Sequence, residues 1–183
     1  MEKTQILENK LDVYFDLLEE YWYNHSFLTY QWWAMILITI IPWFIWWKFA
    51  DKKRLMEIFL FGLLIMFTTV LLAPIKQNLN FWQFFHSIHW SLSTPLYPYE
   101  ITLLPVIYMF VYQFSKNWTS YVIGTFLVTC LFVFIVMPLF IKLNFILFVS
   151  YRSHFIAMIS LIIIAVLSRW LIYSHFSRKA CKP

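Results

Sequence analysis

The chain has 183 residues, of which 62% are hydrophobic and only 13% are charged, and its formal net charge is +5. An average soluble domain is about 45–50% apolar and about 25% charged, and a chain of this length leaves roughly a third of its surface in water. This composition excludes both a soluble globular domain and a disordered chain. The two glycines, Gly62 and Gly124, are too few for a glycine-rich phosphate loop or a dinucleotide-binding motif.

The first 30 residues are predicted to form an amphipathic helix that precedes the membrane domain. Apolar side chains recur at spacings of four and three, as on one helical face: Leu7, Leu11, Tyr14, Leu18 and Tyr21. Glu8, Asp12, Asp16 and Glu19 lie away from this stripe, whereas helices that bind anionic headgroups carry Lys and Arg. Two hypotheses stay open for residues 1–25: an interfacial helix, or a docking helix for a protein partner or a second copy.

Five segments are apolar and long enough to cross a bilayer as helices, which takes about 20 residues each. They cover approximately residues 32–49, 55–74, 98–114, 119–141 and 154–173. The sequence therefore predicts an all-α integral membrane bundle of five transmembrane helices over residues 31–175, followed by a basic tail at 176–183. The aromatic stretch at 75–97 is predicted to lie in the headgroup region, as a short interfacial helix or a re-entrant segment.

The distribution of Lys and Arg predicts how the bundle is oriented. Nine such residues lie in the loop at 48–54, at Lys116 and in the C-terminal end from Arg169 onward, against five on the opposite side. We therefore expect a multi-pass protein of the cell membrane with its N-terminus outside and its C-terminus in the cytoplasm. Because the basic residues are distributed over short loops, no nucleic-acid partner is predicted.

Glu57 is predicted to form a structural ion pair near the start of the second span. Lys53 and Arg54 precede it by four and three residues and so share its helical face.

Glu100 is the candidate ligand or proton site, because carboxylates near the membrane interior are costly and are functional candidates by default. The predicted topology brings five other polar residues to the same outer side: Lys76, His86, His89, Arg152 and His154. Two readings stay open: a helix-start carboxylate paired with Arg152, or a ligand or proton site with His154 nearby.

The histidine and cysteine pattern is too sparse for a metal or a disulfide framework. His86 and His89 share a helical face and could help hold zinc, but this spacing alone is common, so no metal and no cofactor are predicted. Cys130 lies inside the fourth span and Cys181 in the C-terminal tail, so the two are not expected to pair.

The scarcity of glycine predicts helices that pack through large side chains. Close crossings are expected mainly in the fifth span, where Ser153, Ala157, Ser160 and Ser168 form a stripe of small residues. Pro42 and Pro105 are expected to kink the first and third spans.

Four stretches of the sequence resemble a known family: YWYNHSFLTYQWW at 21–33, IPWFIWWKFADKKRLMEIFLFGLL at 41–64, PYEITLLPVIYMFVYQF at 98–114 and RWLI at 169–172. It is an uncharacterised family of small multi-pass membrane proteins from spore-forming Gram-positive bacteria. The resemblance implies a bacterial plasma-membrane protein with an acid at the position of Glu100. It implies no activity and no cofactor. The chain departs from the family before Pro138, where Val136 and Met137 replace an acidic residue.

Two functional hypotheses follow. The first is a non-enzymatic accessory or scaffold protein that acts through its outer N-terminal helix and aromatic loop, with membrane lipids around it. The alternative is an enzyme or carrier for a lipid or isoprenoid that uses Glu100 as acid or base, supported by His154 or His89.

Overall fold

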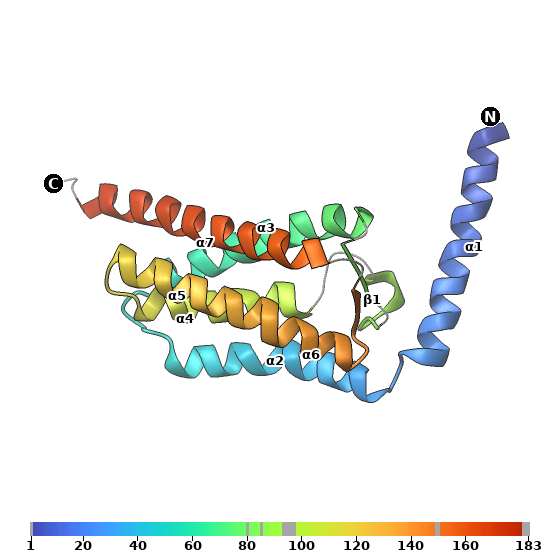
Figure 1. The fold of residues 1–183 in the computed structure, drawn as a ribbon, viewed down its shortest axis with the longest axis horizontal. Helices are drawn as coiled ribbons and strands as arrows, with labels where there is room; N and C mark the ends of the chain where they lie inside the picture. The colour runs from blue at the N-terminus through green and yellow to red at the C-terminus, as the bar shows by residue number, and fades with distance from the viewer. Residues whose placement is uncertain (1, 80, 85, 93–97, 149–150, 181–183) are drawn as a thin grey trace.

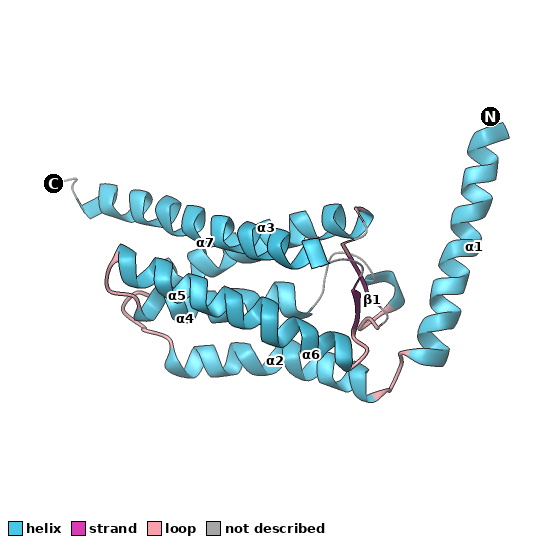
Figure 2. Ribbon diagram, in the orientation of Figure 1, coloured by secondary structure: helices cyan, strands magenta, loops and turns pink. Residues whose placement is uncertain are grey.

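The computed structural model describes residues 2–79, 81–84, 86–92, 98–148 and 151–180, and is almost entirely helical (Figure 2). In chain order its elements are α1 (Glu2–His25), α2 (Tyr30–Phe49), α3 (Leu55–Asn78), β1 (Trp82–Phe84), the 3-10 helix η1 (Trp90–Leu92), the π-helix η2 (Tyr99–Leu103), α4 (Leu104–Phe114), α5 (Trp118–Leu131), the π-helix η3 (Phe132–Val136), α6 (Met137–Lys142), β2 (Ile146–Phe148) and α7 (Tyr151–Ala180).

The described residues contain five apolar helical passes, and these run back and forth through one bundle (Figure 1). Within the described residues, four are long and apolar enough to cross a membrane: Tyr30–Phe49, Leu55–Asn78, Trp118–Lys142 and Ser153–His175. The fifth, Tyr99–Phe114, is apolar but shorter. The prediction of an all-α, multi-pass membrane bundle is confirmed.

The shorter pass is the third in chain order, is made of η2 and α4, and lies at the centre of the bundle. Its buried residues cover more than one helical face and include Glu100, Val106, Tyr108, Met109 and Tyr112. α3 packs along α4, α2 packs against η2 and α4, and α5 packs on α4 from another side. α7 closes the bundle against α3 and α5. A helix enclosed in this way has little contact with lipid, so it does not need the length of a lipid-facing span.

Two prolines coincide with the π-helical turns. η2 ends two residues before Pro105, and η3 ends two residues before Pro138. A proline ring collides with the carbonyl four residues earlier, and the wider π-turn relieves that collision. The expected irregularity at Pro105 is thus a π-turn, whereas α2 continues as an α-helix through Pro42.

The outside of the bundle is strongly apolar. Large side chains such as Phe44, Phe67 and Ile135 are more than 60% exposed. Soluble monomers rarely expose this much apolar surface. In a bilayer the same side chains contact acyl chains.

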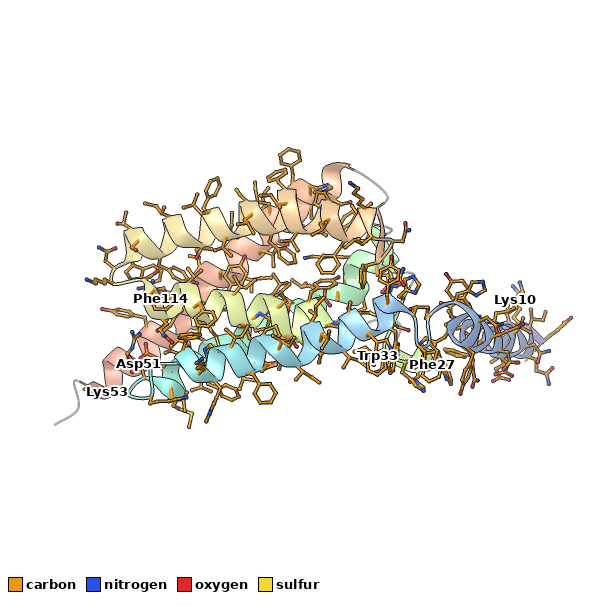
Figure 3. The ribbon with its side chains drawn as sticks, turned by 90° about the horizontal axis from the view of Figure 1, so that it is seen from below. Lys10, Phe27, Trp33, Asp51, Lys53 and Phe114 are labelled. Carbon is orange, nitrogen blue, oxygen red and sulfur yellow. The ribbon has the colours of Figure 1, made fainter. Side chains whose placement is uncertain are left out.

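α1 ends before the predicted boundary at residue 30 and runs crosswise to the bundle at one end (Figure 1). Residues 26–29 form a turn in which Leu28 adopts a left-handed φ of 59°. Thr29 then caps α2 by accepting a hydrogen bond from the backbone N of Trp32. At the same end, β1 and β2 form a short antiparallel ribbon in which Gln83 is opposite Leu147. Figure 3 shows Lys10, Phe27 and Trp33 at this end and Asp51 and Lys53 at the opposite one.

The two glycines lie where neighbouring side chains approach a helix closely. A Cβ added to Gly62 of α3 would lie 2.4 Å from Sδ of Met109 in α4, and one added to Gly124 of α5 would lie 3.2 Å from Cγ1 of Val111. In the fifth span, where small-residue crossings were expected, Ser153, Ala157 and Ser168 are buried. The close approach at Gly62 was not expected.

Replacing Gly62 by Ala should destabilise the bundle by about 1–3 kcal/mol, because an added methyl must displace the fully buried Met109. The matched control is Gly124→Ala, where the nearest contact is longer and the gain in helix propensity of about 1 kcal/mol offsets it. Thermal unfolding in detergent measures both. Equal melting temperatures for the two variants would contradict this account.

Candidate functional site

Charged side chains enter the described bundle near each of its ends. Glu100 and Lys76 lie near the end that carries α1, and Arg54, Glu57 and Arg169 lie near the other. Buried charges are costly unless surrounding groups compensate them.

Glu100 is almost fully buried, at 4% exposure, in the first turn of the central pass. It lines a small cavity of about 30 Å³ together with Lys76, Thr69 and Tyr99. Apolar residues of α4, η3, α6 and α7 form the remaining walls. A space of this size holds a water molecule or a single small ion.

The carboxyl group of Glu100 shares its cavity with the side chain of Lys76. The carbonyl oxygen of Glu100 accepts a contact from Oγ1 of Thr69 at 3.4 Å, while its buried Oε2 has no hydrogen-bond partner among the described residues. Nζ of Lys76 donates to Oγ of Ser160 on α7 at 2.9 Å. The pair can therefore hold a polar molecule or exchange a proton inside the bundle.

The residues predicted to accompany Glu100 are distributed differently. The Arg152 side chain lies outside the described part of the structure. The ring of His154 stacks on Phe134, with 6.3 Å between ring centroids, and is not part of the cavity wall. Lys76 lines the cavity beside Glu100, and His154 does not. The signal that could have identified Lys76 is its predicted position on the same outer side as Glu100.

His86 and His89 belong to the attachment of α1, and their environments differ. His86 is 9% exposed, and its Nδ1 lies 3.2 Å from Oγ of the buried Ser26. Burial lowers the pKa of His86, and the nearby His25 lowers it further. His89 is exposed, and its Nδ1 lies 2.8 Å from Oγ of Ser91. Within the described residues, no three His, Cys, Asp or Glu side chains gather as metal ligands would.

Two indole groups hold the loop that carries these histidines. Nε1 of Trp22 in α1 donates to the carbonyl of Ser87, and Nε1 of Trp32 in α2 donates to the carbonyl of Ile88, each at 2.9 Å. Trp22 is 6% exposed and is the buried residue of α1. The aromatic loop is thus the part of the bundle that fixes the C-terminal end of α1.

At the opposite end, Glu57 pairs with Arg54 as predicted, but Lys53 does not join them. Nε and Nη2 of Arg54 donate to the two carboxylate oxygens of Glu57 at 3.1 and 3.0 Å. The hydroxyl of Tyr112 in α4 donates to the same carboxylate. The hydrogen bond to Glu57 raises the pKa of Arg54. The Lys53 backbone instead donates to Asp51, so this cluster joins the start of α3 to the end of α4.

Arg169 is the charged residue whose role the sequence reasoning missed, because it was counted only as a topology signal. It is 8% exposed in α7, and its guanidinium lies over the rings of Tyr121 at 4.3 Å, Trp118 at 5.0 Å and Tyr112 at 5.4 Å. Aromatic faces stabilise a desolvated guanidinium by cation–π attraction. Its position inside the fifth predicted span was the available signal.

Comparison with protein-family models, with curated proteins and with solved structures finds no match to this chain. Functional inference therefore depends on the residues and on the geometry described above.

Replacing Lys76 by Met should destabilise the protein by about 3 kcal/mol, because the buried carboxyl of Glu100 loses its opposite charge. Adding Glu100→Gln should recover part of this loss, since a neutral amide needs no counter-charge. The coupling in this double-mutant cycle should be about 1 kcal/mol or more. Thermal unfolding in detergent gives the four stabilities.

Lys142→Met is the matched control, since Lys142 is exposed near the same end. Additive effects of Lys76→Met and Glu100→Gln would show that the two groups do not interact.

Proposed function

We propose that the protein is a non-enzymatic accessory or scaffold protein of the plasma membrane that binds a partner protein through α1. The observation that carries this proposal is the exposed apolar stripe of α1. Leu7, Leu11, Tyr14 and Tyr21 are each more than 40% exposed, although large apolar side chains at regular helical spacing usually face a neighbour.

The attachment of α1 supports presentation of this stripe to another protein. Trp22 is anchored on the carbonyl of Ser87, and Ser26 contacts His86 just beyond the helix. The remainder of α1 runs away from the bundle (Figure 1). A helix that is fixed at one end and apolar along its free length is suited to docking, because less orientational freedom is lost on binding.

Charge favours a different protein over a second copy or the lipid surface. Residues 2–25 contain six acidic residues and two lysines. A second α1 alongside the first would bring like charges together, and an anionic membrane surface would repel the same residues. The partner we infer therefore carries an apolar groove with basic side chains along its edges.

The alternative, an enzyme or carrier for a lipid or isoprenoid at Glu100, receives less support. The cavity beside Glu100 measures about 30 Å³, whereas sites for small-molecule ligands typically measure about 300–1,000 Å³. A lipid chain would need the central helices to separate.

A photo-crosslinking amino acid at the position of Leu11 should capture a discrete protein partner in native membranes, because this position lies on the exposed stripe. The same group at the position of Asp12, off the stripe, is the matched control and should capture little. Mass spectrometry of the crosslinked product identifies the occupant. Crosslinks to lipid from Leu11 would instead indicate an interfacial helix, and a product of twice the chain mass would indicate self-association.

We also propose that α1 lies outside the cell and that the C-terminus is cytoplasmic. The α2–α3 and α4–α5 turns lie at one end of the bundle (Figure 1), so the basic residues of 48–54 and Lys116 share that end. The excess of Lys and Arg there supports a cytoplasmic location. The resemblance to membrane proteins of spore-forming Gram-positive bacteria stays a prediction and agrees with a plasma-membrane location.

In intact cells of a Cys130→Ser variant, Cys181 should react with a membrane-permeant thiol reagent and resist an impermeant one. A second variant, Cys130→Ser/Cys181→Ser/Asp12→Cys, should react with both reagents. The reverse pattern of labelling would invert the proposed orientation.

A further inference from the structure

A large groove opens between α2 and α3 at the basic end of the bundle. It measures about 660 Å³, and most of its wall is aromatic or aliphatic. Trp43, Trp46 and Trp47 contribute from α2, and Met56 and Phe59 contribute from α3. Its volume lies in the range typical of small-molecule sites, about 300–1,000 Å³.

Ring contacts hold the walls of this groove in shape. Trp46 is 2% exposed and lies edge-on to Trp43, at 5.9 Å between ring centroids. Phe59 of α3 contacts both rings, at 6.4 Å from Trp43 and 6.1 Å from Trp46. The groove is therefore formed before any ligand enters it.

The turn between α2 and α3 is fixed by a side chain of α4. The side-chain amide of Gln113 in α4 accepts from the backbone N of Asp51 at 3.1 Å and donates to the carbonyl of Phe49 at 2.9 Å. This clamp sets where Lys52 and Lys53 leave the turn. Both lysines line the groove and are exposed.

The charges at this turn leave the groove positive. Arg54 is neutralised by Glu57 at 3.0 Å. Nζ of Lys52 donates to the carbonyl of Trp47 at 2.6 Å and lies 3.9 Å from the centre of its ring, so its charge is held at the edge of the groove. Asp51 offsets one of the two lysine charges, so a net positive charge stays at the edge of the groove. The edge is thus cationic and the interior is apolar.

We propose that this groove binds one anionic phospholipid, with an acyl chain along Trp43, Trp46 and Phe59 and the phosphate beside Lys52 and Lys53. Basic pockets between transmembrane helices bind anionic headgroups in this way. The lysines lie beyond the ends of two spans, at the depth of the headgroups. The site is independent of the partner proposed for α1, and it requires only that the basic end of the bundle meets a membrane surface.

Native mass spectrometry of the full-length protein in detergent, titrated with dioleoyl-phosphatidylglycerol or dioleoyl-phosphatidylcholine, tests the proposal. The anionic lipid should bind with higher affinity as a single copy. The double variant Lys52→Gln/Lys53→Gln should lose about tenfold in that affinity. The matched control is Lys48→Gln/Lys116→Gln, which removes the same charge from the same end outside the groove and should change affinity little.

A second pair of variants tests the acyl-chain part of the site without changing charge. Met56→Trp should fill the groove and lower the affinity for phosphatidylglycerol, and the exposed position of Met56 leaves the fold intact. Phe67→Trp, on the same helix outside the groove, is its control. Three results would each overturn the proposal. The first is equal affinity for the two lipids, and the second is an equal loss of affinity in a variant and its control. The third is an effect of the lysine substitutions without an effect of Met56→Trp.

Discussion

The close packing of α3 against α4 is the contact on which the rest of the bundle depends. Because Gly62 has no side chain, Met109 can fill the space against α3. One turn after Met109 in α4, Tyr112 stacks on Phe61 of α3, with 4.5 Å between ring centroids. This stacking brings the Tyr112 hydroxyl to Glu57. α4 thereby becomes a central helix on which α2 and α5 also pack.

A central helix imposes a second constraint, because each polar group that it carries must find a partner away from water. The hydroxyl of Tyr108 is 2.7 Å from Oγ1 of Thr129 in α5, and Oγ1 of Thr102 donates to the carbonyl of Thr39 in α2. These contacts fix the neighbours of α4 in register. Glu100 is the exception among these groups, since its Oε2 is buried without a hydrogen bond among the described residues. The exception makes it the best candidate in the interior for binding water, a small ion or a proton.

The interior is too closely packed for a large ligand, so the candidate binding surfaces lie on the outside of the molecule. One is the exposed stripe of α1, which lies beyond one end of the bundle (Figure 1). The other is the aromatic groove between α2 and α3, near the opposite end. Both are supported by polar contacts from the bundle, through Ser87 for α1 and through Gln113 for the groove. The two surfaces are far apart, so the protein partner proposed for α1 and the lipid proposed for the groove can bind independently.

Local features of the molecule could be predicted from the sequence alone. Long apolar runs determined the all-α membrane fold and the approximate limits of the helices, and the three-residue spacing of Arg54 and Glu57 determined their ion pair, because hydropathy and helical spacing depend on residues close together in the chain. The tertiary structure decided which faces of different helices meet. It brought Lys76 to the cavity beside Glu100, and it enclosed Arg169 among three aromatic rings. These contacts arise from packing between distant segments, and no local pattern in the sequence records that packing.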